Sequence, residues 1–342
     1  MPVTATHWRS RTKAALTGAR RARRTVVASV GEHAEELRRV LQSASHPGAT
    51  PPRAASPHPL ASRRVRPIDV KHLGREQVIC CWKVGDVLVD PGPESTLDTL
   101  LAELGDERPR ALLLTHIHFD HAGAAGALVR LWPELEVWVH EKGARHMVDP
   151  SRLLASARQL NDDFDERWGE VVPLPERSLR VLYGGESIDG WDVAYTPGHA
   201  KHHVSYRHRE SGWVFAGDTC GVRHPSSGFV LPPTPPPDVD IEAWYASLDA
   251  IEAWEPETLA ITHFGSYSDV SGHLGRLRGA LEHWSELARI VDAGGYEAAL
   301  RAAEHAALDS ASAESFNQAI QAENQWPGLQ RYFRKRAEAS AD

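Results

Sequence analysis

The chain has 342 residues, of which 42% are hydrophobic and 25% charged, and its formal net charge at pH 7 is -8. This composition is ordinary for a folded enzyme with one large or two modest domains and a sizeable core. No apolar run approaches the ~18 residues of a membrane span, the N-terminus lacks a hydrophobic signal core, and three cysteines cannot build a disulfide framework, so we expect a cytoplasmic protein.

The charge is unevenly distributed along the chain. Residues 1–66 carry 13 Lys and Arg against 3 Asp and Glu, whereas the remaining residues carry 25 and 43. Few large apolar residues interrupt the Arg, Ala, Ser and Pro of this segment, which predicts a basic, largely disordered extension with one amphipathic helix between Val26 and Leu41. An arm that binds nucleic acid or anionic surfaces and an over-called translation start are the alternatives. Deleting residues 1–64 is expected to leave folding and metal content intact.

Short β-rich runs and amphipathic runs alternate from Ile68 onward. Ser95 is the predicted N-cap of the first helix, and Gly105 ends it. The alternation of strands and helices predicts an α/β sandwich. In chain order the predicted elements are strand 77–83, strand 87–89, helix 96–104, strand 111–114, a helix ending near residue 133 and strand 136–140.

The second half begins with a polar helical insertion over residues 143–171, which we interpret as a lid, a dimer contact or an ordinary surface helix. The next strands are predicted over 180–183, 191–195, 203–206 and 212–216. A Pro- and Ser-rich segment over 225–237 is predicted to be a loop, helix 241–254 and strand 258–261 follow it, and helical segments then continue to residue 336. These last helices are predicted to serve packing or dimerisation.

The stretch from Thr115 to His121 contains four candidate metal ligands directly behind an apolar run. Side chains two residues apart in extended backbone point the same way, so His116 and His118 can bind one ion while Asp120 and His121 turn toward a second. A single histidine is usually a surface or core residue, but this pattern behind a buried strand favours a metal site, since imidazole and carboxylate suit zinc.

This stretch resembles the signature THxHxDH of the metallo-β-lactamase-fold hydrolases. Later segments are similar to further motifs of that family: TPGH at 196–199, GDT at 217–219 and THFG at 262–265, with a strand ending in Asp90 upstream. The resemblance covers roughly residues 67–270. It implies a four-layer αββα sandwich for a catalytic domain over 67–270, between the basic extension of residues 1–66 and a C-terminal helical subdomain over 271–342.

The resemblance also implies a set of site residues. His116, His118 and His199 would hold the first ion, Asp120, His121 and His263 the second, and Asp218 would bridge the two. Asp90 and His203 would lie behind the ligands, with Asp90 orienting an imidazole. A hydroxide shared by two divalent ions would attack a carbonyl, with Asp120 orienting it and shuttling its proton. Zinc is the expected metal, while iron and manganese stay open.

The predicted function is a dinuclear metal-dependent hydrolase acting on the ester, thioester or lactone carbonyl of a small molecule. The alternative is an oxidoreductase like the mononuclear iron persulfide dioxygenases of this fold, which use only the positions of His116, His199 and Asp218. Nucleic-acid processing is disfavoured because the body of the chain is acidic. Thiol-processing relatives carry Gly-Cys-Gly-Arg after the bridging Asp, a sequence absent here, and Gly221 stands where lactonases place Tyr. No membrane partner is expected, and a homodimer stays open.

The substrate rim is the least specified part of the prediction. Its candidates come from the insertion and from the segment after Asp218, namely Phe164, Trp168, Arg223, His224 and Phe229. Lys201, His202 and His224 are expected to be solvated loop residues unless they contact substrate, and Cys220 is expected to behave as a small hydrophobe. Because most of these rim candidates are aromatic and apolar, we expect an acyl or aryl substrate without a strong anionic group.

Overall fold

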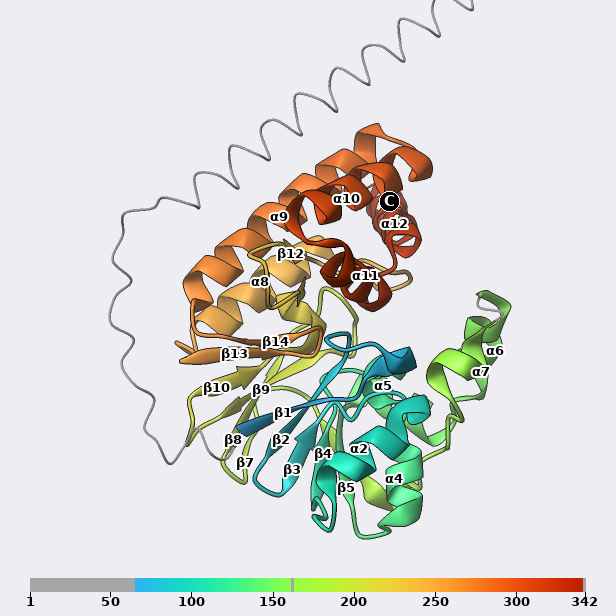
Figure 1. The fold of residues 1–342 in the computed structure, drawn as a ribbon, viewed down its shortest axis with the longest axis vertical. Helices are drawn as coiled ribbons and strands as arrows, with labels where there is room; N and C mark the ends of the chain where they lie inside the picture. Colours follow the sequence, from blue (N-terminus) through green and yellow to red (C-terminus); the bar gives the residue numbers. More distant parts are fainter. Residues whose placement is uncertain (1–64, 161–162, 341–342) are drawn as a thin grey trace, which may run out of the picture. The chain divides into compact units, whose positions relative to one another are not determined.

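The computed structural model describes residues 65–160 and 163–340 (Figure 1). The predictions for residues 1–64, including the helix between Val26 and Leu41, lie outside the described residues. The described residues show the expected alternation of strands and helices. They fold into two facing sheets, outer helices and a C-terminal group of helices.

One strand of the first sheet, β4, leads into the loop that contains the HxHxDH motif. Its strand order is β1-β2-β3-β4-β5-β6, with the first three strands antiparallel and β3 to β6 parallel. Parallel strands covered on both faces are apolar throughout, and every residue of β3 and β4 is buried. The strands are β1 (Val65–Asp69), β2 (Cys80–Val84), β3 (Val87–Val89), β4 (Ala111–Leu113), β5 (Glu136–His140) and β6 (Leu179–Leu182).

The second sheet supplies the other ligand-bearing loops. Its order is β14-β13-β10-β9-β8-β7, in which only β10 and β13 pair in parallel. β7 and β14 were not predicted, since two or three residues give too short a pattern to recognise. The strands are β7 (Ser187–Ile188), β8 (Trp191–Tyr195), β9 (Val204–His208), β10 (Trp213–Phe215), β13 (Thr258–Ile261) and β14 (Gly265–Tyr267).

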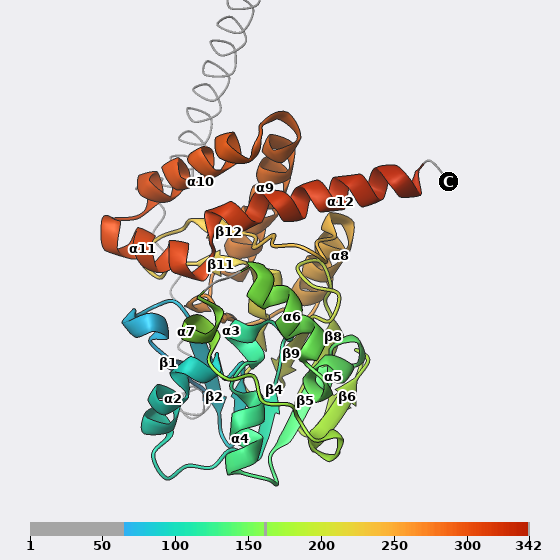
Figure 2. The same cartoon turned by 90° about the vertical axis from the view of Figure 1, so that its right-hand side faces the viewer.

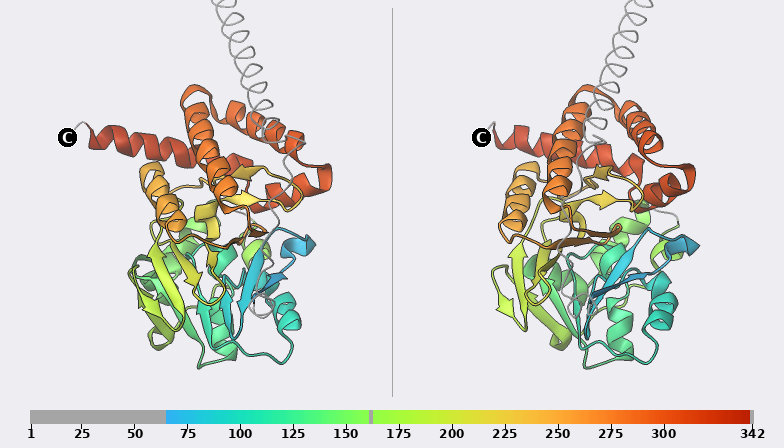
Figure 3. Two further views of the ribbon diagram at one scale, coloured as in Figure 1. Left: turned by 90° about the vertical axis from the view of Figure 1, so that its left-hand side faces the viewer. Right: turned by 60° about the vertical axis from the view of Figure 1, so that its left-hand side comes forward.

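Aromatic side chains fill the space between the two sheets. Trp82 and Trp191 both contact Phe215, with ring centroids 6.0 and 5.5 Å apart. Adjacent Cys80 and Cys81 face opposite sides of β2, as the period of two predicts: Cys80 lies between the sheets and Cys81 beneath the outer helices. Helices α2 (Leu97–Leu104), α4 (Ala125–Leu131) and α5 (Glu141–Val148) cover the first sheet, and α8 (Ile241–Glu252) and α9 (Val270–Ile290) cover the second (Figure 3). The four-layer αββα prediction is confirmed.

Helices α9, α10 (Ala293–Ala307), α11 (Ser310–Ala319) and α12 (Gln325–Ala339) gather at one end of the sandwich and share an apolar core (Figure 1). Aspartates begin three of them. The side chains of Asp269, Asp292 and Asp309 each accept a hydrogen bond from the N–H three residues later, which satisfies a free donor of the first turn. None of the described helices combines the length and apolarity that a membrane crossing requires.

Three local predictions need correction. Ser95 does not cap α2, because its hydroxyl donates to the carbonyl of Arg167 at 2.6 Å and the helix begins at Leu97 after a 3-10 turn. The helix after the motif is split into α3 (Phe119–Ala122) and α4. The 225–237 segment is not only a loop, because β12 (Val230–Leu231) pairs with β11 (Val222–Arg223). The first difference depends on a contact distant in sequence, between Ser95 and Arg167.

Candidate metal centre

The HxHxDH motif lies where β4 passes into α3. His118 has extended backbone angles, φ -63° and ψ 151°, and is the N-cap of α3. His116 and His118 therefore project from extended backbone, and Asp120 and His121 from the first turn of the helix. This change of backbone explains how four polar side chains, closely spaced in sequence, form two separate groups.

Three imidazoles form the first group. Nε2 of His116 and Nε2 of His199 each lie 3.0 Å from Nδ1 of His118. His199 comes from the loop that follows β8, so two sheets contribute to this group. Nitrogens bound at about 2.0–2.1 Å to one tetrahedral ion lie roughly 3.3–3.4 Å apart, so a small outward shift of these rings would fit a shared ion.

A carboxylate and two imidazoles form the second group. Nε2 of His263 lies 3.2 Å from Oδ2 of Asp120, and Nε2 of His121 lies 3.8 Å from the same oxygen. His263 follows β13, on the second sheet. The ligand atoms of these three residues all lie within 4.8 Å of one another, as do those of the first group.

Asp218 lies between the two groups. Its Oδ2 is 3.3 Å from Nε2 of His199, and its Oδ1 is 3.3 Å from Nε2 of His121. Asp218 Oδ1 and His121 Nε2 are buried without a hydrogen-bond partner. Buried polar atoms normally have partners, so these atoms fit a cation that would take the place of the missing bonds.

The far nitrogens of three ligand rings are fixed by hydrogen bonds. In each ring Nδ1 donates and Nε2 is left to face the cluster, an arrangement typical of metal-binding histidines. The acceptors are Oδ2 of Asp90 for His121, the carbonyl of Pro233 for His199 and the carbonyl of Val78 for His263, each at 2.8 Å.

Asp90 joins the ends of strands from both sheets. Its Oδ1 accepts the N–H of Thr115 at 2.8 Å, and its Oδ2 accepts the hydroxyls of Thr115 and Thr262, both at 2.7 Å, besides Nδ1 of His121. The carboxylate is completely buried. A carboxylate bound in this way fixes both the tautomer and the orientation of the His121 ring.

The two groups differ in their electrostatics. Burial lowers the pKa of His118 to about 3, and burial together with His121 lowers the pKa of His116 well below its usual value. Burial also acts to lower the pKa of His263, but Asp218 and Asp120 raise it overall. The first group therefore offers neutral nitrogen lone pairs, whereas the second is a place where carboxylates favour positive charge.

His203 lies behind the first group. Its Nδ1 is 3.1 Å from the hydroxyls of Thr196 and Thr219, and its ring stacks on His116 at a centroid distance of 5.0 Å. Its buried Nε2 has no partner. Cys220 is fully buried in an apolar cluster, and burial raises the pKa of its thiol.

The expectation of a solvated His202 is wrong. This residue is 6% exposed, and its Nδ1 accepts the N–H of Ile117 at 3.4 Å. Gly143 of α5 packs closely against Ile117, since a Cβ there would lie 2.8 Å from Cγ2 of Ile117. His224 is likewise buried, with Nδ1 2.7 Å from a serine hydroxyl, whereas Lys201 is exposed and pairs with an aspartate.

The candidate rim residues have different surroundings. Phe164 is 2% exposed and packs edge-on against Phe119, beside Asp120, with centroids 4.9 Å apart. The half-buried ring of Trp168 stacks on the ring of His72. The guanidinium of Arg223 lies 4.0 Å from the ring centre of Tyr267 on β14. Phe229 is buried against the C-terminal helices. Arg223 and His224 line a narrow hollow beside His263.

Sequence reasoning missed His72, which lies in the turn after β1. It is 1% exposed, its ring stacks on Trp168 with centroids 5.1 Å apart, and its Nε2 donates to the carbonyl of Arg167 at 2.9 Å. The charges of Asp120 and His263 influence its pKa, which burial lowers. No motif surrounds this histidine in the sequence, so only the folded chain reveals it.

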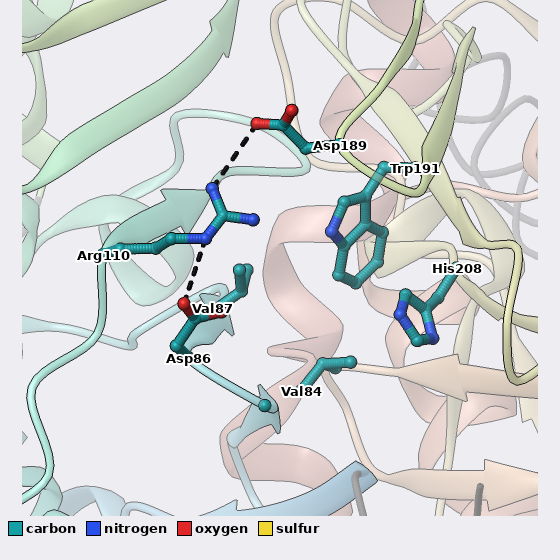
Figure 4. A pocket seen from close by; sticks show the side chains of 8 residues that line it. Val84, Asp86, Val87, Arg110, Asp189, Trp191 and His208 are labelled. Carbon is teal, nitrogen blue, oxygen red and sulfur yellow. Dashed lines mark hydrogen bonds and ion pairs between the residues drawn. The ribbon is translucent and has the colours of Figure 1, made fainter.

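A second hollow, of about 150 Å³, lies at the opposite ends of β4, β8 and β9 from the metal cluster. The guanidinium of Arg110 lies between the carboxylates of Asp86 and Asp189, with Nε–Oδ2 and Nη1–Oδ2 distances of 3.1 and 3.5 Å (Figure 4). Trp191 and His208 line the facing wall (Figure 4). Because the guanidinium of Arg110 is already paired with two carboxylates, this hollow offers no free charge to a ligand.

Comparison with known families agrees with this geometry. The model of the Metallo-beta-lactamase superfamily matches residues 85–263, from the turn before β3 to the histidine after β13. The chain belongs to the metallo-β-lactamase superfamily. Its buried histidine and aspartate groups are of the kind that can hold metal ions.

The curated relatives match parts of the chain. A hydroxyacylglutathione hydrolase of Legionella pneumophila (strain Corby) is 28% identical over 139 residues, 40% of this chain and 44% of that protein. The metallo-beta-lactamase fold-containing protein ST1585 of Sulfurisphaera tokodaii is 25% identical over 215 residues, 59% of this chain and 77% of the relative. The match thus spans less than half the length of the hydroxyacylglutathione hydrolase.

Solved structures show the same fold. The crystal structure of ST1585 from Sulfolobus tokodaii covers 78% of this chain and 98% of its own, with 21% identity and a TM-score of 0.55. The metallo-beta-lactamase family protein TTHA1429 from Thermus thermophilus covers 80% and 93%, with 22% identity and a TM-score of 0.56. At these identities the likeness concerns the fold alone.

Proposed function

We propose that the protein is a dinuclear metal-dependent hydrolase of an ester, thioester or lactone. The observation that supports it most is the position of Asp218, whose two carboxylate oxygens each lie 3.3 Å from an imidazole nitrogen of a different group. One carboxylate facing two sets of nitrogen and oxygen donors is the arrangement that two neighbouring divalent ions require. Zinc suits these donors, and iron or manganese is the alternative.

Two divalent ions bound here would make a water molecule nucleophilic near neutral pH and polarise a carbonyl oxygen. Asp120 is the residue that we assign to proton transfer. Its side chain is 20% exposed against 5% for Asp218, so it faces the open side of the cluster. Burial acts to raise the pKa of Asp120, but His121 and His263 lower it overall and keep the carboxylate ionised. It can therefore orient the water and transfer its proton toward the leaving group.

The surroundings of the cluster favour a substrate without a strongly anionic group. The half-buried Phe119, which precedes Asp120 and packs against the buried ring of Phe164, contributes apolar surface, and the half-buried Trp168 stacks on His72. The nearby cations are already engaged: Lys201 pairs with Asp238, and Arg223 donates to the carbonyl of a serine and stacks on a tyrosine. An acyl or aryl ester, or a lactone, fits these surroundings better than a glutathione thioester with its two carboxylates.

Metal analysis and a substrate panel test the proposal. We expect about two zinc ions per chain and hydrolysis of aryl esters, acyl esters or aliphatic lactones. Turnover of S-lactoylglutathione with kcat/KM above roughly 10⁴ M⁻¹s⁻¹, with the other substrates far below, would overturn the substrate assignment. A single iron per chain with oxygen uptake on a persulfide would overturn the hydrolase assignment.

A further inference from the structure

The turn between β1 and β2, residues 70–78, lies directly behind the second ligand group. Its last carbonyl, of Val78, accepts the Nδ1–H of His263 at 2.8 Å. The N–H of Cys80 donates to the carbonyl of Thr262 at 2.8 Å, so the two segments are joined next to the ligand. The position of the His263 ring therefore depends on where the 70–78 turn is held.

This turn has an unfavourable backbone. Lys71, Leu73 and Gln77 have φ values of 50°, 50° and 62°, in the left-handed region that residues other than glycine rarely adopt. Such a backbone persists only where surrounding contacts determine it. The carboxylate of Asp69 supplies two of these contacts, accepting the N–H groups of Lys71 and Gln77 at 3.0 and 2.7 Å.

The C-terminal helix α11 supplies the others. Nε2 of Gln318 donates to the carbonyl of His72 at 2.7 Å, and the hydroxyl of Ser315 donates to the carbonyl of Glu76 at 3.0 Å. Arg75 donates from Nε to Oε1 of Gln318 at 3.1 Å. The turn thus contacts α11 and, through His72, α7 (Phe164–Trp168); Figure 2 draws it below α11 and beside α7.

The first ligand group has a corresponding connection. The carbonyl of Pro233 accepts the Nδ1–H of His199 at 2.8 Å. The next residue, Thr234, donates its N–H at 2.5 Å to Oε1 of Gln325 and its hydroxyl at 3.1 Å to the carbonyl of the same residue, the first of α12. Gln325 is 3% exposed. The α12 backbone lies so close that a Cβ on Gly328 would be 1.9 Å from the carbonyl oxygen of Thr234.

We propose that Gln318 and Gln325 are positioning residues of the metal centre, one for each ligand group. Gln318 holds the 70–78 turn and through Val78 the ring of His263, while Gln325 holds Thr234 and through Pro233 the ring of His199. The C-terminal helices are therefore an outer part of the metal centre and not only a packing unit. The inference rests on the proposed dinuclear site.

Three glutamine variants test it, each changed to methionine, which keeps much of the volume but cannot hydrogen-bond. Gln318→Met should raise the zinc dissociation constant of the second site about 10-fold and leave that of the first site within about 2-fold. Gln325→Met should raise the constant of the first site about 10-fold and leave that of the second within about 2-fold. Gln330→Met is the matched control, because the side chain of Gln330 donates its hydrogen bond to the carbonyl of Ala288 within the C-terminal helices and not to either segment. Zn²⁺ is titrated in competition with a chromophoric chelator.

Hydrogen exchange on the metal-free chain provides a second measurement. Gln318→Met should speed exchange in peptides covering residues 70–80, and Gln325→Met in peptides covering 230–238, whereas Gln330→Met should speed neither. If Gln325→Met fails to fold, Thr234→Val, which removes the hydroxyl that donates to the carbonyl of Gln325, should weaken the first site and leave the second unchanged. Ser315→Ala gives a second test of the 70–78 turn. Equal weakening of both sites, or unchanged sites and exchange, would overturn the inference. A wild-type chain that holds one ion would count against the proposed dinuclear function. Hydrogen exchange would then still show whether Gln318 and Gln325 hold the 70–78 turn and the 230–238 segment.

Discussion

The metal cluster and the core of the C-terminal helices are both buried, but they bury different chemistry. In the cluster, imidazole rings and carboxylates face one another, and three ring nitrogens are fixed at 2.8 Å by acceptors outside the cluster. The C-terminal core contains large apolar side chains, such as Trp284, Tyr296 and Leu300, each at most 3% exposed. The cluster depends on the direction of each polar atom, whereas the helical core depends on volume.

This difference predicts that substitutions in the cluster change chemistry and metal binding, and that substitutions in the helical core change stability. The largest effect is expected for Asp120→Asn. Turnover should fall by roughly 10²–10⁴-fold, because the amide can neither take nor return a proton, while metal content should fall less. Parallel measurement of kcat and bound zinc checks this. Loss of metal in proportion to activity would show that Asp120 acts only as a ligand.

His263→Ala and His116→Ala should separate the two ligand groups. We expect His263→Ala to weaken the second ion by about 100-fold or more and to retain the first, and His116→Ala to do the opposite, since each imidazole belongs to one group. Metal titration of both variants provides the test, and each variant serves as the control of the other. Equal loss of both ions in the two variants would contradict the assignment to separate groups.

Leu300→Ala tests the helical core. Leu300 is fully buried on α10, so the truncation should lower the free energy of unfolding by about 2–5 kcal/mol, the usual cost of a buried Leu→Ala change. Zinc stoichiometry and kcat should stay at the wild-type values under conditions where the variant is folded. Urea denaturation and metal analysis measure the two properties. A fall in kcat without a fall in stability would remove the distinction between the two regions.

Glu304 is the exception within the helical core, and it predicts the smallest effect. Burial raises the pKa of this carboxyl to about 7, and Oε1 has no hydrogen-bond partner. The contribution of the protonated carboxyl to folding stability is therefore complete below about pH 4.5. It is lost as the pH rises through 7, where the buried carboxylate becomes charged. Glu304→Gln should be more stable than the wild type at pH 8 by roughly 1 kcal/mol, less than the full linkage because the buried amide of glutamine also needs hydrogen-bond partners.

The control for this prediction is Glu338→Gln, which changes an exposed carboxyl on α12. Urea denaturation at several pH values between 5 and 8 should show the advantage of Glu304→Gln shrinking as the pH falls, while the control follows the wild type. An advantage that is the same at pH 5 and pH 8 would show that the carboxyl of Glu304 does not titrate in this range.

The sequence by itself determined the αββα fold and the order of most of its elements. The pattern from Thr115 to His121 and the later motifs pointed to the cluster because ligands carried by strand ends must occur in fixed local patterns. The strand before Asp90 likewise indicated a residue behind the ligands. Local periodicity was sufficient for most strands and helices that are long enough to show it. It failed for β7, β11, β12 and β14, which have two or three residues each, and also for the five-residue β1, which pairs along its length with β2.

Only the tertiary structure decided what lies behind and around the cluster. The carbonyls of Val78 and Pro233 accept hydrogen bonds from ligand rings that are 185 and 34 residues away in the sequence. Backbone carbonyls are common to every residue, so no sequence pattern can mark them. The positions of Gln318 and Gln325 are decided in the same way, through contacts between segments distant in the chain, because the packing of α11 and α12 against the sandwich determines which atoms meet.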